Sequence, residues 1–112
     1  VNDATNLKYK DKNFDIVVSA CCLLHIINYK KAISEAARVA KKYVIFHRTP
    51  VYSIRPTTFF TKTAYNAEML EIVFNEGELV DLFRENGMSV IKIITISNCE
   101  NITIKNYLCR KM

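Results

Sequence analysis

Two histidines and a pair of adjacent cysteines are the side chains of this 112-residue chain best suited to chemistry. A neutral imidazole at His47 could take a proton from an attacking hydroxyl or amine, and His25 could either line a site or pack its turn. Cys21 and Cys22 would need a nearby base or cation to act as nucleophiles, and more ligands than His25 to hold a metal. The neighbouring sequence offers neither, so we expect buried, unreactive thiols and no metal site.

These residues lie near the ends of two predicted strands joined by a helix. Phe14–Ala20 is a nearly continuous apolar run, typical of a parallel strand buried on both faces, and Tyr43–His47 is a second buried strand. Between them, apolar residues at three- and four-residue spacing predict a helix over Tyr29–Lys41, with Asn28 as its N-cap. Ligands of open α/β sheets bind outside the carboxyl ends of the strands, and the small residues that end the first strand leave room for one.

The predicted helix has an apolar face and a charged face. Ile33 and several alanines form the apolar face, whereas Glu35 and Arg38 project elsewhere. Lys41 and Lys42 lie at the negative end of the helix dipole, where cations are favoured. This pattern indicates a helix that lies on a sheet with its charges in solvent.

The second half of the chain is predicted to contain a loop and another helix. Arg48–Asn66 holds both prolines and is expected to be irregular, and Met69–Phe74 fits either a short strand or a helix. Asn75 is a capping residue for a helix over Glu76–Asn86, which Gly87 terminates. The residues that this helix would bury are Leu79, Leu82 and Phe83.

Two β-rich runs near the end of the chain predict a hairpin. Met88–Ser97 and Ile102–Lys111 flank a turn at Asn98–Asn101. Such a turn places Cys109 opposite position 91 or 92 and not opposite Cys99, so we expect no disulfide between them. Free thiols fit a reducing compartment, and no apolar run is long enough to span a bilayer, so we expect a cytoplasmic protein with no membrane partner.

Four short motifs, in this order, resemble those of the class I (Rossmann-like) S-adenosylmethionine-dependent methyltransferases. They are Asp3-Ala4, Phe14-Asp15-Ile16-Val17, Leu24-His25-Ile26 and Glu35-Ala36-Ala37-Arg38-Val39. The resemblance implies an α/β fold, the C-terminal half of a doubly wound Rossmann-like methyltransferase sheet, as a single partial domain over residues 1–112. In the family's sheet order 3-2-1-4-5-7-6, it makes strands 4, 5, 6 and 7, with 6 and 7 in an antiparallel hairpin, of Phe14–Ala20, Tyr43–His47, Met88–Ser97 and Ile102–Lys111.

The resemblance also implies a cofactor and a set of site residues. The cofactor is S-adenosyl-L-methionine, and the residues implied to bind it are Asp3, Ala4, Ser19, Ala20, Cys21 and His25. His47 would be a catalytic base or a contact to the methyl acceptor. The loop residues that would shape the acceptor pocket are Arg48, Tyr52, Arg55 and Tyr65.

One departure from the family limits what this chain can do by itself. The glycine-rich loop that cradles the amino-acid end of the cofactor and the acidic residue that binds its ribose are both absent from the sequence. We therefore expect weak cofactor binding, or none, and no activity from these residues alone. An open apolar edge beside Phe14–Ala20 would favour pairing with a second copy, giving a homodimer.

Charge is distributed unevenly and leaves two other functions open. Six carboxylates and one base lie between Glu68 and Asn86, so that segment carries −5 and the remainder +10, within a net charge of +5. A basic surface can attract nucleic acid, but no arginine-rich or aromatic-interleaved cluster is present, which favours a solvated lysine-rich face. The alternatives to a methyltransferase with an unidentified acceptor are a non-catalytic α/β interaction domain and a basic RNA-binding module.

Overall fold

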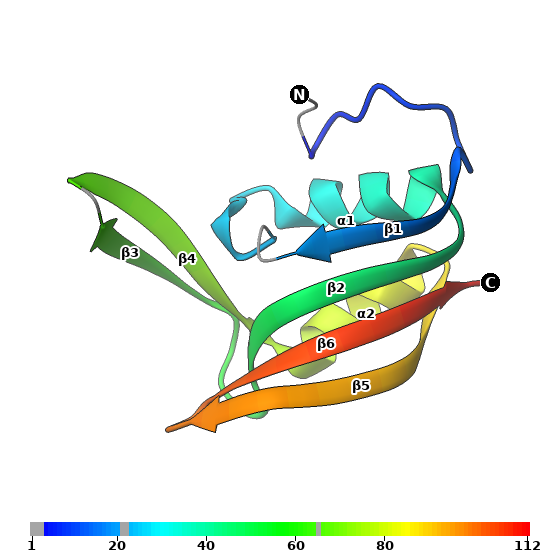
Figure 1. Cartoon of the computed structure of the whole chain (residues 1–112). Helices are drawn as coiled ribbons and strands as arrows, with labels where there is room; N and C mark the ends of the chain where they lie inside the picture. The colour runs from blue at the N-terminus through cyan, green and yellow to red at the C-terminus, as the bar shows by residue number, and fades with distance from the viewer. Residues whose placement is uncertain (1–3, 21–22, 65) are drawn as a thin grey trace.

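The structure is a computed structural model that describes residues 4–20, 23–64 and 66–112. Over these residues the strands are β1 (Phe14–Ala20), β2 (Ala40–Tyr52), β3 (Thr58–Ala64), β4 (Ala67–Asn75), β5 (Met88–Cys99) and β6 (Ile102–Lys111). The helices are the short 3₁₀ turn η1 (Leu23–His25), α1 (Tyr29–Val39) and α2 (Glu76–Glu85). Figure 1 shows a twisted mixed sheet from which the β3–β4 hairpin extends. Neither α-helix in the described ranges is long and apolar enough to cross a membrane.

The main body of the sheet has the strand order β1-β2-β6-β5. β1 runs parallel to β2, and β6 runs antiparallel to both of its neighbours. This order and these directions confirm the predicted C-terminal half of a Rossmann-like methyltransferase sheet. β4 joins β2 only at Val51 and Tyr52, beyond the point where β1 ends (Figure 1).

The segment Arg48–Asn66, predicted to be irregular, consists mostly of β-structure. β2 continues through Tyr52 and carries Pro50 in its interior. A bulge at Arg48, whose φ is 55°, shifts the register of β2 against β6 just before the proline. β3, which is rich in threonine and phenylalanine, then pairs with β4, so the ambiguous run Met69–Phe74 is a strand.

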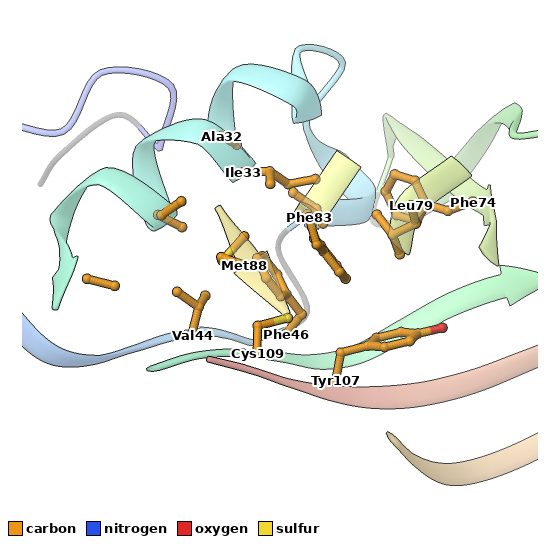
Figure 2. Close-up of a cluster of buried hydrophobic side chains, with 14 of the residues drawn as sticks. Ala32, Ile33, Val44, Phe46, Phe74, Leu79, Phe83, Met88, Tyr107 and Cys109 are labelled. Atoms are coloured by element: carbon orange, nitrogen blue, oxygen red, sulfur yellow. The ribbon is translucent and has the colours of Figure 1, made fainter. Parts of the chain in front are cut away.

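Both helices pack on one face of the sheet around a shared core. In Figure 2, Ile33 of α1 and Phe83 of α2 lie over the sheet with Phe46 of β2 and Tyr107 of β6, and all four are buried. The rings of Phe46 and Phe83 stack with their centroids 4.5 Å apart. This core fixes the two helices relative to β2, the strand that carries His47.

α1 ends earlier than predicted. Ala40 is already extended and begins β2, so Lys41 and Lys42 lie in a strand and not at the end of the helix. Lys111 of β6 takes their place, because its ammonium group donates hydrogen bonds to the carbonyl oxygens of Ala37 and Ala40. A cation does stabilise this helix end, but it comes from the far end of the chain.

α2 has the capping that its sequence predicts. The side chain of Asn75 accepts a hydrogen bond of 3.0 Å from the backbone N–H of Glu78, and Gly87 has a φ of 75° just after the helix. Of the residues predicted to be buried, Leu79 and Phe83 are, and Leu82 is half-buried. Asn28 occupies the N-cap position of α1, but its side chain makes no cap hydrogen bond.

β1 is more exposed than its apolar sequence predicts. Val17 packs against the core, whereas Ile16 and Val18 on the opposite face are 54% and 59% exposed. Both helices lie on the side of Val17, and no element of the described ranges covers the other side. The prediction of a strand buried on both faces is therefore wrong for β1.

The β5–β6 hairpin turns at Glu100 and Asn101, within the predicted segment. Cys109 lies opposite Val90, one position earlier than predicted, because a bulge follows Val90. Cys99 is exposed and Cys109 is buried, and both are free thiols, as their register predicts. Burial raises the pKa of the Cys109 thiol to about 12, so it is unreactive at neutral pH.

Candidate ligand site at the strand ends

The carboxyl ends of β1 and β2 form a step. β1 ends at Ala20, which lies beside His47, while β2 continues to Tyr52. The sequence predicts that His47 ends its strand, and this is wrong because β2 continues beyond it to Tyr52. His47 does lie level with the end of β1, and it is half-buried. The backbone N–H of Arg48 donates a hydrogen bond of 2.8 Å to the side chain of Asn106, which holds the bulge next to His47.

An apolar cavity of about 230 Å³ opens between β1, α1 and the N-terminal segment, defined here as residues 4–13. Ala4, Leu7 and Tyr9 line it from the N-terminal segment, and Ser19 lines it from the end of β1. Ala4 and Ser19, two of the residues predicted to bind a cofactor, thus face one cavity although they are far apart in the sequence. Ala20 lies at the adjacent strand end, and Asp3 and Cys21 lie outside the described residues.

The wall of this cavity is held by a glutamate–arginine pair on α1, which we call the Glu35–Arg38 clamp. Arg38 Nε donates to Glu35 Oε2 over 2.6 Å, and the other Glu35 oxygen accepts from the backbone N–H of Leu7 over 2.9 Å. Glu35 is only 5% exposed, which corrects the prediction that it projects away from the core. Its hydrogen bond from the Arg38 guanidinium holds the pKa of the Glu35 carboxyl below its usual range, despite the burial.

His25 fixes η1 against β4. Its Nδ1 lies 2.7 Å from the carbonyl oxygen of Leu70, so in the tautomer that carries a proton on Nδ1 it donates a hydrogen bond. His25 itself is exposed. Of the two uses that the sequence left open for His25, the structure gives a contact for packing the turn, and its use in cofactor binding stays a prediction.

A second, more polar pocket lies between the β2–β3 loop and the tip of the β5–β6 hairpin. Its volume is about 410 Å³, and Tyr52 and Arg55 line it together with Asn98 and Asn101. The Arg55 guanidinium lies over the Tyr52 ring, 5.7 Å from its centroid. Two of the four predicted acceptor residues therefore share a pocket. Arg48 is exposed at the bulge and does not line this pocket, and Tyr65 lies outside the described residues.

A second carboxylate, half-buried and missed by sequence reasoning, joins α2 to the sheet. Glu76 Oε2 accepts hydrogen bonds from Lys105 Nζ at 2.7 Å and from the Tyr107 hydroxyl at 2.6 Å. Burial raises the pKa of Glu76, but these two donors outweigh it and leave the pKa below its ordinary value. Burial together with the Glu76 carboxylate raises the pKa of Tyr107.

The sequence carries a partial signal for the Glu35–Arg38 clamp and none for the hydrogen bonds of Glu76. The i, i+3 spacing of Glu35 and Arg38 indicates an ion pair on one helix, although nothing in it points to the N-terminal segment. Glu76 and Tyr107 are far apart in the chain, and only their shared place in the fold connects them. Within the described ranges no group of three or more histidine, cysteine or acidic side chains could hold a metal ion.

Comparison with known proteins supports the fold. Residues 1–46 match the family model described as "Methyltransferase domain". No curated protein matches the chain. Many solved structures do, at low sequence identity and with high structural similarity.

Three of the similar structures illustrate which kinds of protein have this fold. An S-adenosylmethionine-dependent methyltransferase from Methanosarcina mazei is 16% identical, with a TM-score of 0.73. The match covers 99% of this chain and 65% of the methyltransferase chain. The 1,6-didemethyltoxoflavin-N1-methyltransferase of Burkholderia thailandensis, with bound S-adenosylhomocysteine, is 18% identical, with a TM-score of 0.70, covering 96% and 48%. The [4+2]-cyclase SpnF is 15% identical, with a TM-score of 0.72, covering 98% and 54%.

The comparisons define the fold. The chain has the Rossmann-like fold of class I S-adenosylmethionine-dependent methyltransferases, and its first 46 residues match the methyltransferase family model. It spans about half to two thirds of the length of these three structures. Because a cyclase shares the fold, the reaction has to be argued from the site.

Proposed function

We propose that this chain is part of an S-adenosylmethionine-dependent methyltransferase, with the ends of β1 and β2 facing the methyl donor and the acceptor. One observation carries the proposal. Ala4 of the N-terminal segment and Ser19 near the end of β1, both implied by the resemblance to bind the cofactor, line the same cavity, which runs along β1 from Phe14 to Ser19. Its Ser19 end lies at the carboxyl end of β1, where open α/β sheets bind their ligands.

The cavity suits one end of the methyl donor. Its apolar lining fits the face of an adenine ring, and its volume of about 230 Å³ is below the roughly 300–1,000 Å³ of sites that hold a whole drug-sized ligand. Both glycines of the chain, Gly77 and Gly87, lie in α2 or just after it. Neither can therefore belong to a glycine-rich loop at β1 that would hold the amino-acid end of the cofactor. We therefore assign the adenine end to residues of this chain. The ribose and amino-acid ends would need groups that these residues do not supply.

Methyl transfer requires a positioned acceptor and a route for its proton. When bound, S-adenosylmethionine supplies a methyl group on a positively charged sulfur, and the carbon–sulfur bond breaks as the acceptor's oxygen or nitrogen bonds to that carbon. In the proposal the half-buried His47 imidazole, level with Ala20, accepts the proton that the acceptor's O–H or N–H loses. Tyr52 and Arg55 hold the distal part of the acceptor in the second pocket.

The proposal is tested by titrating S-adenosylhomocysteine into this chain and into the full product of its gene. We expect weak or undetectable heat with the chain alone and clear binding with the full product, followed by transfer of a labelled methyl group to an acceptor. Binding without transfer to any acceptor would favour a cyclase-like or non-catalytic role. Absence of binding by the full product would contradict the proposal. Salt-sensitive binding of RNA in that case would favour the basic RNA-binding module.

His47→Ala separates the acceptor site from the cofactor site. We expect turnover to fall or the acceptor KM to rise, with cofactor affinity nearly unchanged, because the cavity is lined by Ala4 and Ser19 and not by His47. Steady-state kinetics of the wild type and the variant, with cofactor affinity measured separately, checks this separation. Unchanged kinetics would assign His47 to packing.

A further inference from the structure

The Glu35–Arg38 clamp connects α1 to a segment that has no regular structure of its own. Arg38 Nη1 donates to the carbonyl oxygen of Tyr9 at 2.8 Å and to the carboxylate of Asp11 at 2.7 Å, and Nη2 donates to the carbonyl oxygen of Leu7 at 2.9 Å. The backbone oxygen of Arg38 in turn accepts from the N–H of Lys12 at 2.9 Å. With the bond from Leu7 N–H to Glu35, one turn of α1 holds the segment at four residues.

These contacts use the whole guanidinium group. Its three nitrogens are directed at two carboxylates and two backbone carbonyls, a planar fork that a lysine ammonium cannot reproduce. Glu35 is buried, so its charge depends on Arg38 and Leu7 for compensation. An i, i+3 ion pair in solvent would need no such compensation, because water solvates its charges. The arrangement therefore fixes the N-terminal segment in one place on the helix.

The clamped segment forms one wall of the candidate cofactor cavity. Leu7, held through both its N–H and its carbonyl, lines the cavity, and so do Ala4 and Tyr9. α1 contributes Ala32 and Ala36 to the same cavity, on the helix turns next to Glu35. A shift of the segment along α1 would change the shape of the cavity and displace Ala4.

We propose that Glu35 and Arg38 are positioning residues that set the adenine-binding wall by holding residues 7–12 in register on α1. The inference rests on the proposed function for its ligand. Its mechanical part, that the clamp orders the segment, does not. Neither residue contacts the cofactor in this proposal, since the clamp acts through the backbone of Leu7 and Tyr9.

The test compares Arg38→Lys with Arg84→Lys in the full product of the gene. Arg84 forms an i, i+3 pair with Asp81 on α2, over 3.3 Å and well exposed, and it does not contact the N-terminal segment. We expect Arg38→Lys to weaken the binding of S-adenosylhomocysteine and of adenosine by the same factor, at least about tenfold, because misplacement of a binding wall by an ångström is costly. The acceptor KM should stay unchanged, and Arg84→Lys should bind like the wild type.

Amide hydrogen exchange provides a measurement that needs no ligand. The Leu7 N–H should exchange faster in Arg38→Lys and in Glu35→Gln, and at the wild-type rate in Arg84→Lys. If Arg38→Lys does not fold, Asp11→Asn removes a single exposed contact and should give a smaller change in the same direction.

The outcomes separate the two proposals. Faster exchange at Leu7 with unchanged affinity for adenosine would overturn the positioning role, and unchanged exchange would overturn the clamp itself. If the wild type binds no S-adenosylhomocysteine, the proposed function fails, and the exchange data still decide whether the clamp orders the segment.

Discussion

The two α-helices are anchored at opposite ends. α2 is fixed at its start, where Asn75 caps the first turn and Glu76 binds Lys105 and Tyr107. α1 has no side-chain cap at Asn28 and is fixed in its last turns, where Arg38 and Lys111 act. Each anchor includes contacts from distant parts of the chain, to which the local Asn75 cap is added in α2.

The partners of the two anchors differ in kind. Glu76 joins side chains of regular elements, so its network adds stability to a packed core. The Glu35–Arg38 clamp binds the backbone of an irregular segment, so its network determines where that segment lies. The first should matter most for unfolding, and the second for ligand binding.

Glu76→Ala should give the largest loss of stability. It leaves the Lys105 ammonium and the Tyr107 hydroxyl partly buried without their common acceptor, which costs about 2–3 kcal/mol. Urea unfolding of wild type and variant measures the difference. Tyr107→Phe, which removes one hydrogen bond and keeps the ring, should cost about 1 kcal/mol. Equal stability of Glu76→Ala and wild type would remove the distinction between the two anchors.

Lowering the pH should cause a smaller loss of stability than Glu76→Ala does, because a protonated Glu76 can still accept a hydrogen bond from Tyr107. The pKa of Glu35 and that of Glu76 are both below the ordinary value for glutamate, about 4.3. The stabilisation is therefore fully present above the unfolded-state pKa and is lost as pH falls below it towards the folded-state pKa. The urea midpoint should decline below about pH 4.5, and less steeply in Glu35→Gln and in Glu76→Gln. A midpoint that is flat from pH 7 to 3 would contradict this.

The two capping asparagines should respond unequally. Asn75→Ala should cost about 1 kcal/mol, whereas Asn28→Ala should cost only a few tenths, since the Asn28 side chain makes no cap hydrogen bond. Their backbones explain the difference: Asn75 is extended, with ψ at 125°, and Asn28 has ψ at 52°. Thermal unfolding of both variants is the check, and equal losses would show that Asn28 caps α1 in solution.

Weak self-association is the smallest effect expected, and it tests the open edge of β1. We propose that the chain forms a homodimer through this edge, because β1 pairs with β2 and with no other strand of the described ranges, and its Ile16 and Val18 are exposed. Sedimentation at rising concentration should show a dimer that the double variant Ile16→Thr, Val18→Thr loses. Ile54→Thr, at a loop residue that is 89% exposed, is the control. A wild type that stays monomeric throughout would argue against the dimer.

The sequence predicts the elements with strong local signals. β1, the hairpin strands and the capped start of α2 follow from apolar runs, turn residues and Asn75, whereas the order in which the strands pair comes from the family resemblance. The resemblance implies that Ala4 and Ser19 bind one cofactor, and the structure places both in the lining of one cavity, while cofactor binding itself stays a prediction. These features depend on short stretches of chain, which is why a single sequence is sufficient for them.

What the sequence does not predict depends on distant neighbours. The continuation of β2 through Pro50 depends on pairing with β6 and on the bulge at Arg48, and neither has a local signal. Glu35 is read as a surface charge because its partners, Leu7 and the fork of Arg38, meet it only after α1 and the N-terminal segment come together. The exposure of β1 depends on which elements cover it, and an apolar strand looks the same whether or not it is covered.

The pairing of β2 with β6 has a consequence for biosynthesis. Val44 lies opposite Cys109, and the cation that closes α1 is Lys111, so β2 acquires β6 as a neighbour only after β6 itself has been synthesised. Until then Val44 and Phe46 have no complete core, and the nascent chain presents apolar strand surface to chaperones. Translation speed over the last strand should therefore influence the yield of folded protein more than translation speed over the first.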